Sequence, residues 1–142
     1  MENLSSKSLM IGDYVRYIGA EAFGDMRQGD IVKVDALQGK YICVGNGWAY
    51  CDMFAPIPLI AEILVKNGWE EKPDVENAVC EYRRKIKEGE GFFTFDMEIR
   101  IDCDPYGDYH LMHNGTSFCY VTYVHQLQHA LQLLGVTKEI EL

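Results

Sequence analysis

The fold is decided by the stretch Tyr123-Val124-His125-Gln126-Leu127-Gln128-His129-Ala130-Leu131-Gln132-Leu133-Leu134-Gly135, which is the clearest helix in the sequence. At about 100° of rotation per residue, four of its apolar side chains fall within roughly 80° of arc. These four are Val124, Leu127, Leu131 and Leu134. A stripe of this width is typical of a helix that packs one face on a sheet. The pattern therefore predicts a helix over 123–134 that covers a sheet formed by other parts of the chain.

The residues that flank this stretch match the two ends of a helix. Thr122 suits the N-cap, because its hydroxyl can accept a backbone N–H from the first turn. Gly135 suits the left-handed position that follows a helix, and Val136 can then fold back over Leu131. Both ends of the predicted helix therefore carry suitable capping residues.

Two of the four histidines lie on this predicted helix, at His125 and His129. Their mean direction is roughly 160° from the apolar stripe, on a face that they share with two glutamines. We therefore predict that both imidazoles point outward, where they are candidate contacts for a partner.

The same histidines support an alternative hypothesis, a metal-dependent enzyme. Two histidines at positions i and i+4 can chelate a first-row metal, and aspartates can add oxygen ligands. Other candidate ligands are Asp102, Asp104, Asp108, His110 and His113. Against this hypothesis, positions 126 and 128 are both glutamine, so there is no H-E-x-x-H pattern. Two outward-facing histidines would also lack the surrounding groups that orient metal ligands. We therefore expect no metal and no other cofactor.

Composition and charge narrow the function classes. A chain of 142 residues has room for one ordinary domain or two small ones. The net charge of −9 disfavours sequence-independent binding to a phosphate backbone, so nucleic acid is an unlikely partner. The polar residues 1–8 do not resemble a signal peptide, and no apolar run reaches the roughly 20 residues that a membrane span needs. We expect a soluble cytoplasmic protein that does not bind a membrane.

The cysteine pattern points to reduced thiols with no metal site. The five cysteines are Cys43, Cys51, Cys80, Cys103 and Cys119. Their number is odd, and no two of them have C-x-x-C spacing. We therefore interpret them as small apolar side chains of the core.

Residues 10–56 have the pattern of a small all-β unit. Strand-like segments at 13–18, 30–35, 40–44 and 48–53 are separated by glycine-containing turns, of which Gly45-Asn46-Gly47 is the strongest. Short strands with this punctuation predict a small closed barrel. Because a unit of this size buries little surface alone, we expect it to pack against the segment that follows.

Gly12-Asp13-Tyr14-Val15-Arg16-Tyr17 and Gly29-Asp30-Ile31-Val32-Lys33-Val34, with the loop between them, resemble an SH3-like barrel of the KOW or Tudor kind. Such barrels bind peptides, nucleic acid or other subunits, often through the first loop and exposed aromatic side chains. In this sequence the resemblance points to Tyr17, Phe23 and Trp48 as surface candidates. The alternative is that these three aromatic side chains belong to the barrel core.

Residues 57–142 have the pattern of an α+β subdomain. Pro58 begins a helix over 58–67, and Gly68 suits its end, with Trp69 folding back over it. Strands are predicted over 92–102, 108–113 and 116–121, which together form a three-stranded antiparallel meander. The segment 75–88 fits either a helix or a strand, and its spacing slightly favours a helix. Its basic run, 83–87, is either a solvated charged face or a phosphate-binding patch, and its acidic neighbours favour the former.

A second resemblance covers most of the chain. Ile57-Pro58-Leu59, Lys66-Asn67-Gly68-Trp69-Glu70 and Tyr123-Val124-His125-Gln126-Leu127-Gln128 are similar to motifs of a group of small bacterial and phage-encoded proteins. In that group an N-terminal barrel-like segment likewise precedes a helix, a sheet and a final helix. The group has no assigned function, so the resemblance implies a fold and no activity.

The sequence as a whole favours binding over catalysis. It contains no G-x-S-x-G, Walker A or G-x-G-x-x-G pattern. We therefore predict an α+β protein, with an SH3-like small barrel at 10–56 and an α+β subdomain at 57–142. Its expected role is a non-enzymatic binding or assembly module for a protein partner or for itself. The alternatives are the metal-dependent enzyme and, more weakly, a nucleic-acid-binding accessory protein.

Overall fold

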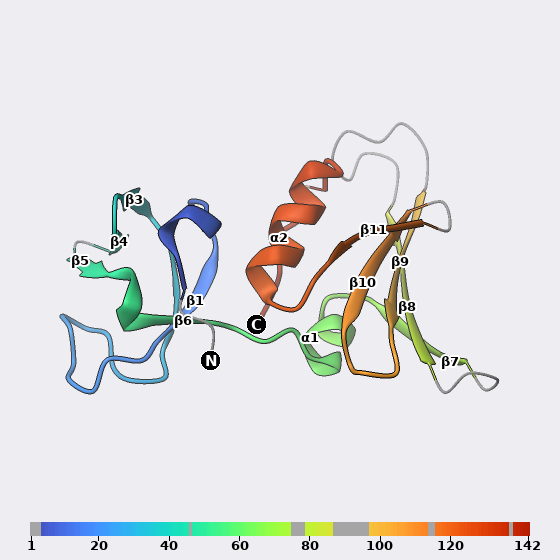
Figure 1. Cartoon of the computed structure of the whole chain (residues 1–142), viewed down its shortest axis with the longest axis horizontal. Helices are drawn as coiled ribbons and strands as arrows, with labels where there is room; N and C mark the ends of the chain where they lie inside the picture. Colours follow the sequence, from blue (N-terminus) through green and yellow to red (C-terminus); the bar gives the residue numbers. More distant parts are fainter. Residues whose placement is uncertain (1–3, 46, 75–78, 87–96, 114–115, 137) are drawn as a thin grey trace. The chain divides into compact units, whose positions relative to one another are not determined.

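The computed structural model describes residues 4–45, 47–74, 79–86, 97–113, 116–136 and 138–142. The fold is α+β, with three antiparallel sheets and two α-helices among these residues (Figure 1). The chain divides into two compact units, Met1–Ile57 (unit 1) and Pro58–Leu142 (unit 2). In the described part of the chain, neither α-helix has the length and apolar character to cross a membrane.

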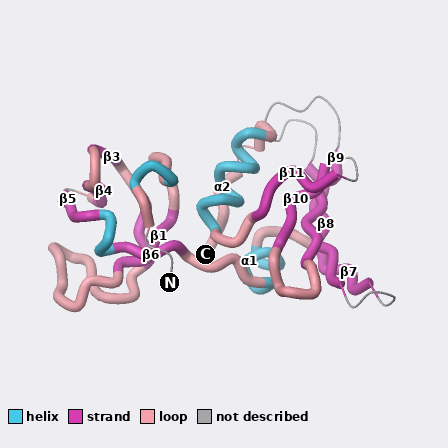
Figure 2. The backbone as a smooth tube through the Cα atoms, viewed as in Figure 1, coloured by secondary structure: helices cyan, strands magenta, loops and turns pink. Residues whose placement is uncertain are grey.

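Unit 1 contains two three-stranded sheets, one ordered β2-β1-β6 and the other β3-β4-β5 (Figure 2). The first sheet comprises β1 (Tyr14–Tyr17), β2 (Ile31–Lys33) and β6 (Phe54–Pro56). The second comprises β3 (Ala36–Gln38), β4 (Tyr41–Val44) and β5 (Gly47–Tyr50). Two 3-10 helices complete the unit, η1 (Ser6–Ser8) and η2 (Cys51–Met53).

Both sheets of unit 1 contribute to one hydrophobic core. Val15 and Tyr17 of β1, Ile42 of β4 and Phe54 of β6 are all buried in it. The Tyr17 ring packs edge-on against Phe54, with 5.7 Å between the ring centroids. This core accounts for the alternation of apolar and polar residues that the sequence shows in β1 and β4.

The described strands of unit 1 do not form the closed barrel that the sequence predicts, and the connections between strands explain why. Only Val34 and Asp35 separate β2 from β3, so the chain bends there from one sheet into the other. Similarly, η2 separates β5 from β6, and β6 pairs with β1. Strands that change sheets at such bends produce two packed sheets with a corner between them.

Unit 2 is built on a five-stranded sheet with the order β11-β10-β9-β8-β7. Its strands are β7 (Glu70–Asp74), β8 (Val79–Ile86), β9 (Met97–Cys103), β10 (Tyr109–His113) and β11 (Thr116–Tyr120). Figure 1 shows α1 (Ala61–Lys66) and α2 (Val124–Leu133) on the same side of this sheet. The sheet face includes Tyr82, Ile101 and Leu111, which occupy neighbouring register positions on β8, β9 and β10 and are all buried.

Of the two alternatives for 75–88, the slightly favoured helix is wrong and the strand is correct in the described part, because Val79–Ile86 is strand β8. Residues 75–78 lie outside the described part of the chain. The β8 strand pairs with β9 over seven registered positions and with β7 on its other side. Pairing on both sides therefore outweighs the helical spacing of the apolar residues. Tyr82 and Arg84, two positions apart in this strand, are both buried.

The meander is correspondingly larger than predicted, since β7 and β8 extend it from three strands to five. Of the strand predicted over 92–102, residues 92–96 lie outside the described part, and β9 covers Met97–Cys103. The two strands predicted at 108–113 and 116–121 are confirmed as β10 and β11, each within one residue at both ends.

Helix α1 is shorter than the predicted 58–67, because its first three residues are held by unit 2 in extended conformation. Pro58 forms a bridge with Tyr123, and the Leu59 N–H donates to the Thr122 carbonyl at 3.0 Å. The predicted C-terminal closure is confirmed. Gly68 has φ +85°, and the Trp69 N–H donates to the Leu64 carbonyl at 3.0 Å.

Helix α2 is confirmed, with a different N-terminal cap from the one predicted. Tyr123 is the N-cap, and the Gln126 side-chain oxygen accepts backbone N–H bonds from Thr122 (2.8 Å) and Tyr123 (3.1 Å). A glutamine at the third helical position thus satisfies the N–H groups that precede the helix, whereas the predicted Thr122 hydroxyl would have accepted an N–H of the first turn. At the other end the predicted closure is confirmed, since the Val136 N–H donates to the Leu131 carbonyl at 2.9 Å.

Candidate functional site

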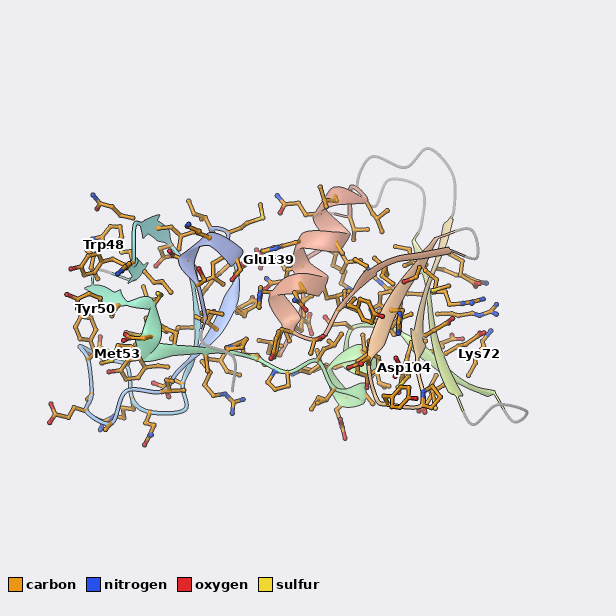
Figure 3. All side chains as sticks on the ribbon, in the orientation of Figure 1. Trp48, Tyr50, Met53, Lys72, Asp104 and Glu139 are labelled. Carbon is orange, nitrogen blue, oxygen red and sulfur yellow. The ribbon has the colours of Figure 1, made fainter. Side chains whose placement is uncertain are left out.

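The outward side of the β3-β4-β5 sheet carries an exposed aromatic surface. Strand register places its side chains in two cross-strand rows, Gln38–Tyr41–Tyr50 and Ala36–Cys43–Trp48. We call these six residues the aromatic face. Trp48 and Tyr50 project from the β4–β5 hairpin in Figure 3. Ile42 and Ala49 alternate with them and are buried in the core, so the backbone pleat sends the aromatic side chains outward.

The three aromatic residues of this face are open to solvent, with exposed fractions of 41% for Tyr41, 43% for Trp48 and 54% for Tyr50. The rings of Tyr41 and Tyr50 pair across the strands, with centroids 4.7 Å apart and an interplanar angle of 33°. The Tyr41 hydroxyl donates to the Tyr50 hydroxyl at 3.1 Å, and this bond raises the pKa of Tyr41 above 10.0. The two rings therefore form one continuous aromatic surface.

The tip of the β4–β5 hairpin is fixed from two sides, which positions Trp48. The Asp35 carboxylate accepts the Gly45 backbone N–H at 2.6 Å. Phe23 packs against the other side, where a Cβ atom on Gly47 would lie only 2.7 Å from the Phe23 ring. A side chain at position 47 would therefore displace the Phe23 ring from its place beside the hairpin.

The three aromatic residues singled out in unit 1 occupy different environments. Trp48 belongs to the aromatic face, and Phe23 is half-buried against the core beside it. Tyr17 is not at the surface. It is buried, and its hydroxyl donates to the Glu21 carbonyl at 2.8 Å, which anchors the β1–β2 loop. Tyr17 therefore belongs to the core, which was the alternative interpretation of the sequence.

Sequence reasoning missed Tyr41 and Tyr50. Each of them alternates with a buried residue in a short strand, which is a detectable signal. Their pairing depends on strand register, however, and register here is set by the Gly45–Gly47 turn. Counting back from that turn would have placed Tyr41 opposite Tyr50 and Cys43 opposite Trp48.

The prediction that both helix histidines point outward is wrong for His125, whose exposed fraction is 4%. The His125 ring stacks parallel to Tyr123, with centroids 5.9 Å apart, and meets His129 edge-on at 5.7 Å. His129 is half-buried. The pair is thus part of a packed aromatic cluster at the start of α2.

The aspartates proposed as metal ligands are engaged in a turn and in an ion pair. Asp102 pairs with Arg100 at 2.7 Å. Asp104 accepts backbone N–H bonds from Tyr106 and Asp108, both at 2.9 Å, and so fixes the β9–β10 turn. Within the described part of the chain, no three His, Cys, Asp or Glu side chains gather closely enough to hold a metal ion.

His110 connects that turn to β11. Its Nε2 atom lies 2.9 Å from Asp104 Oδ2, and its Nδ1 atom lies 3.4 Å from Ser117 Oγ. Aspartate, histidine and serine are also the residue types of a nucleophilic triad. Here the serine is exposed and its hydrogen bond is long, while the aspartate closes its own turn. We therefore assign the cluster a structural role.

Asp104 should make stability depend on acid pH. The pKa of Asp104 is lowered from its ordinary 3.8. The hydrogen bond with His110 is the largest cause, and the backbone N–H groups of Asp108 and Tyr106 also contribute. A carboxylate with a lowered folded-state pKa stabilises the fold above its ordinary pKa, and this contribution is lost as pH falls through the folded value. The free energy of unfolding is measured in urea at neutral pH and again below pH 3.8. It should fall less between these two conditions in Asp104→Asn than in the wild type, because the variant lacks this carboxylate.

Asp108→Asn is the matched control for this prediction, because Asp108 lies in the same turn and is exposed. It should lose as much stability on acidification as the wild type. An Asp104→Asn protein that loses as much as the other two would contradict the prediction.

The basic run that begins at Arg83 does not form an open cationic patch in its described part. Arg83 pairs with Glu81 at 2.9 Å and with Glu98 at 3.2 Å. Arg84, the next residue, is buried. Glu81 also pairs at 3.7 Å with Arg100, which stands directly opposite Arg83 on β9. This arrangement fits a charged sheet face and gives no support to a phosphate site.

The aromatic face is thus the candidate functional site that the geometry supports best. Comparison of the chain with known proteins provides no independent assignment. No family model, no curated protein and no solved structure matches it.

Proposed function

We propose that the protein is a non-enzymatic binding module whose aromatic face takes an extended segment of a protein partner. The exposure of Tyr41, Trp48 and Tyr50 on one sheet face carries this proposal. Tyrosine and tryptophan provide large contact area at a small cost in conformational entropy, and they dominate binding energy where they are central to an interface.

The unit that bears this face supports the same proposal. We propose that unit 1 is an SH3-like module, because a bent β2–β3 segment passes between its two sheets and a 3-10 turn precedes its last strand. The KOW or Tudor resemblance of its sequence agrees with this. Modules of this kind bind peptides, nucleic acid or other subunits, and charge selects among these classes.

Charge and ring chemistry favour a proline-containing basic peptide. Asp35 and Asp52 adjoin the aromatic strands, and residues 1–57 contain five Lys and Arg against seven Asp and Glu. A cationic side chain is favoured beside these carboxylates and over an aromatic ring. A proline-containing segment is already extended before it binds, so it loses little chain entropy when its proline rings pack on the aromatic face. A single nucleic-acid strand could stack on the same rings, but its phosphates would meet this acidic unit unfavourably.

Selection of peptides from a random display library tests the proposal. The full chain should enrich peptides that contain proline and basic residues. Trp48→Ala should weaken their binding more than about tenfold, which corresponds to about 1.4 kcal/mol, because this ring lies within the contact surface. Binding is measured by fluorescence anisotropy of a labelled selected peptide.

The controls separate this face from exposed aromatic residues in general. Tyr106→Ser removes an exposed ring on the β9–β10 turn of unit 2 and should leave peptide affinity unchanged. Peptides that bind Trp48→Ala as tightly as the wild type would refute the proposal. Tighter binding of a labelled single-stranded oligonucleotide than of any selected peptide would favour the nucleic-acid alternative instead.

The metal-dependent enzyme, the main alternative from the sequence, has no comparable support. Three of its candidate ligands make other contacts, Asp102 with Arg100, and Asp104 and His110 with each other.

A further inference from the structure

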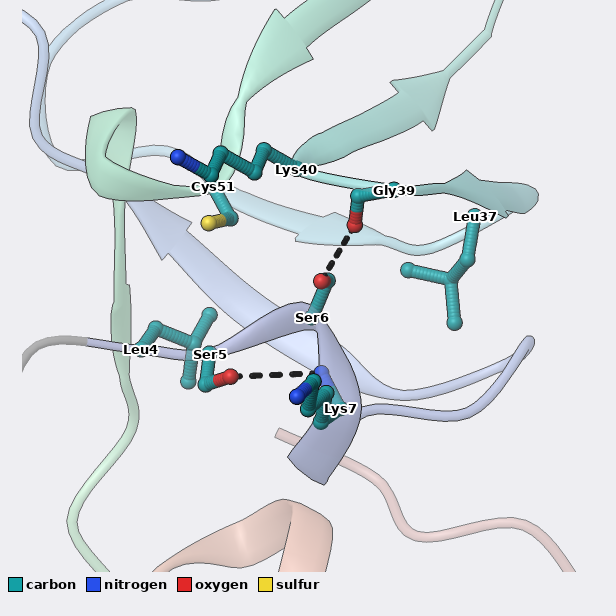
Figure 4. A pocket seen from close by; sticks show the side chains of 8 residues that line it. All are labelled: Leu4, Ser5, Ser6, Lys7, Leu37, Gly39, Lys40 and Cys51. Atoms are coloured by element: carbon teal, nitrogen blue, oxygen red, sulfur yellow. Dashed lines mark hydrogen bonds between the residues drawn. The ribbon is translucent and has the colours of Figure 1, made fainter.

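Unit 1 contains a pocket that does not involve the aromatic face. Its volume is about 680 Å³, which lies within the range of about 300–1,000 Å³ typical of small-molecule sites. It is formed by the N-terminal segment on one side and the β3–β4 turn on the other (Figure 4). The lining residues are Leu4, Ser5, Ser6, Lys7, Leu37, Gly39, Lys40 and Cys51.

Hydrophobic anchors and hydrogen bonds hold the N-terminal wall of this pocket in place. Leu4 and Leu9, on either side of η1, are both buried in the core of unit 1. Between them the Ser6 hydroxyl donates to the Gly39 carbonyl and ties η1 to the β3–β4 turn, as Figure 4 shows. The Ser5 hydroxyl accepts the backbone N–H of Lys7 at 3.3 Å. The pocket is therefore a built feature of the fold.

The lining of the pocket is cationic in a chain of net charge −9. Lys7 and Lys40 are two of the five basic residues in 1–57, and no carboxylate is among the described residues that line the pocket. Among the residues that the structure describes, neither lysine makes an ion pair. Both lysines are exposed, so a ligand can reach them from solvent. The apolar side chains of Leu4 and Leu37 line the same pocket.

We propose that this pocket binds a small amphipathic anion. The carboxylate or phosphate head of the ligand lies against one of the two lining lysines, Lys7 or Lys40, with the serine hydroxyls of the lining as further hydrogen-bond partners. An apolar body of the ligand packs against Leu4 and Leu37, where its burial adds hydrophobic stabilisation. The inference is independent of the peptide-binding proposal, because the lining and the aromatic face share no residue.

Cys51 provides a reporter within the pocket, because its half-buried thiol is free and lines the site. Alkylation of Cys51 by iodoacetamide is followed by mass spectrometry of the digested chain, with octanoate, octyl phosphate, inorganic phosphate and octylamine as probes. At ten times its dissociation constant, octanoate or octyl phosphate should slow alkylation of Cys51 about tenfold. The two probes show whether a carboxylate or a phosphate head is preferred. Cys43, a half-buried thiol on the aromatic face, should be unaffected.

Substitution of the lysines completes the test. The double substitution Lys7→Ala and Lys40→Ala should abolish most of the protection, while Lys72→Ala on β7 of unit 2 should retain it. Because Lys7 and Lys40 are exposed, circular dichroism should show that the double variant folds. Inorganic phosphate, which lacks an apolar body, should protect less than octyl phosphate. Equal protection by octylamine, equal protection of Cys43, or full protection in the double variant would each overturn the proposal.

Discussion

Replacing Leu127 by alanine is expected to lower the free energy of unfolding by about 2–5 kcal/mol. The Leu127 side chain lies on α2 with an exposed fraction of 1%, whereas Leu133, which follows it in the same helix, is 78% exposed. Removing buried methyl groups loses their transfer free energy and leaves a cavity, and the two effects add. The loss should appear in urea unfolding monitored by circular dichroism.

Leu133→Ala is the matched control, because it makes the same chemical change in the same helix. Alanine has a slightly higher helix propensity than leucine, and Leu133 loses little burial, so its effect should lie within about 0.5 kcal/mol. Similar losses for Leu127→Ala and Leu133→Ala would mean that α2 does not pack through the face described above.

Replacing Asn67 by alanine is expected to cost about 1–3 kcal/mol, although Asn67 is a polar residue at the end of a short helix. Its side-chain N–H groups donate to the carbonyls of Ile63 at 2.8 Å and Glu141 at 2.7 Å. Its side-chain oxygen accepts the Glu141 backbone N–H, also at 2.7 Å. Asn67 is buried, so its loss leaves the partly buried backbone groups of Ile63 and Glu141 without this partner.

Two measurements distinguish this role of Asn67 from a general helix-end effect. The backbone N–H of Glu141 should exchange with solvent faster in Asn67→Ala, because it loses its acceptor. Lys66→Ala removes a neighbouring contact, the exposed hydrogen bond from Lys66 to the Leu142 carbonyl, and should cost less than about 0.5 kcal/mol. An Asn67→Ala protein with unchanged stability and unchanged exchange at Glu141 would contradict the prediction.

The helices could be predicted from the sequence because their signals are local. Leucine spacing identified α2, and Gly68 and Gly135 marked the C-terminal ends of α1 and α2 through their left-handed conformation. Strand β8 could not be identified in the same way. Its apolar residues fit a helical period, and only pairing with β7 and β9 determines that they form a strand.

The histidine prediction failed for a related reason. The buried residues of α2 run from Ala130 through Leu127 to His125, which is roughly 220° of arc, whereas the leucine stripe covers much less. An apolar stripe shows where a helix must be covered. It does not show whether the polar residues beside the stripe are covered as well. His125 is such a residue, and it is buried against Tyr123.

The candidate site was predictable only in part. Trp48 was identified as a surface candidate together with Tyr17, which is buried, because a single aromatic residue in a strand fits either face equally well. The aromatic face arises from cross-strand partners, and these depend on turn geometry more than on local composition. Tyr41 and Tyr50 therefore became candidates only when register was known.

The most direct test of the peptide-binding proposal is a nuclear magnetic resonance titration of the full chain with a peptide from the display selection. The chain has two tryptophans, Trp48 on the aromatic face and the buried Trp69 of unit 2, and their indole N–H signals can be assigned with a Trp69→Phe variant. We predict that the Trp48 signal shifts on titration while the Trp69 signal stays in place. A shift of Trp69 with no change at Trp48 would contradict the account.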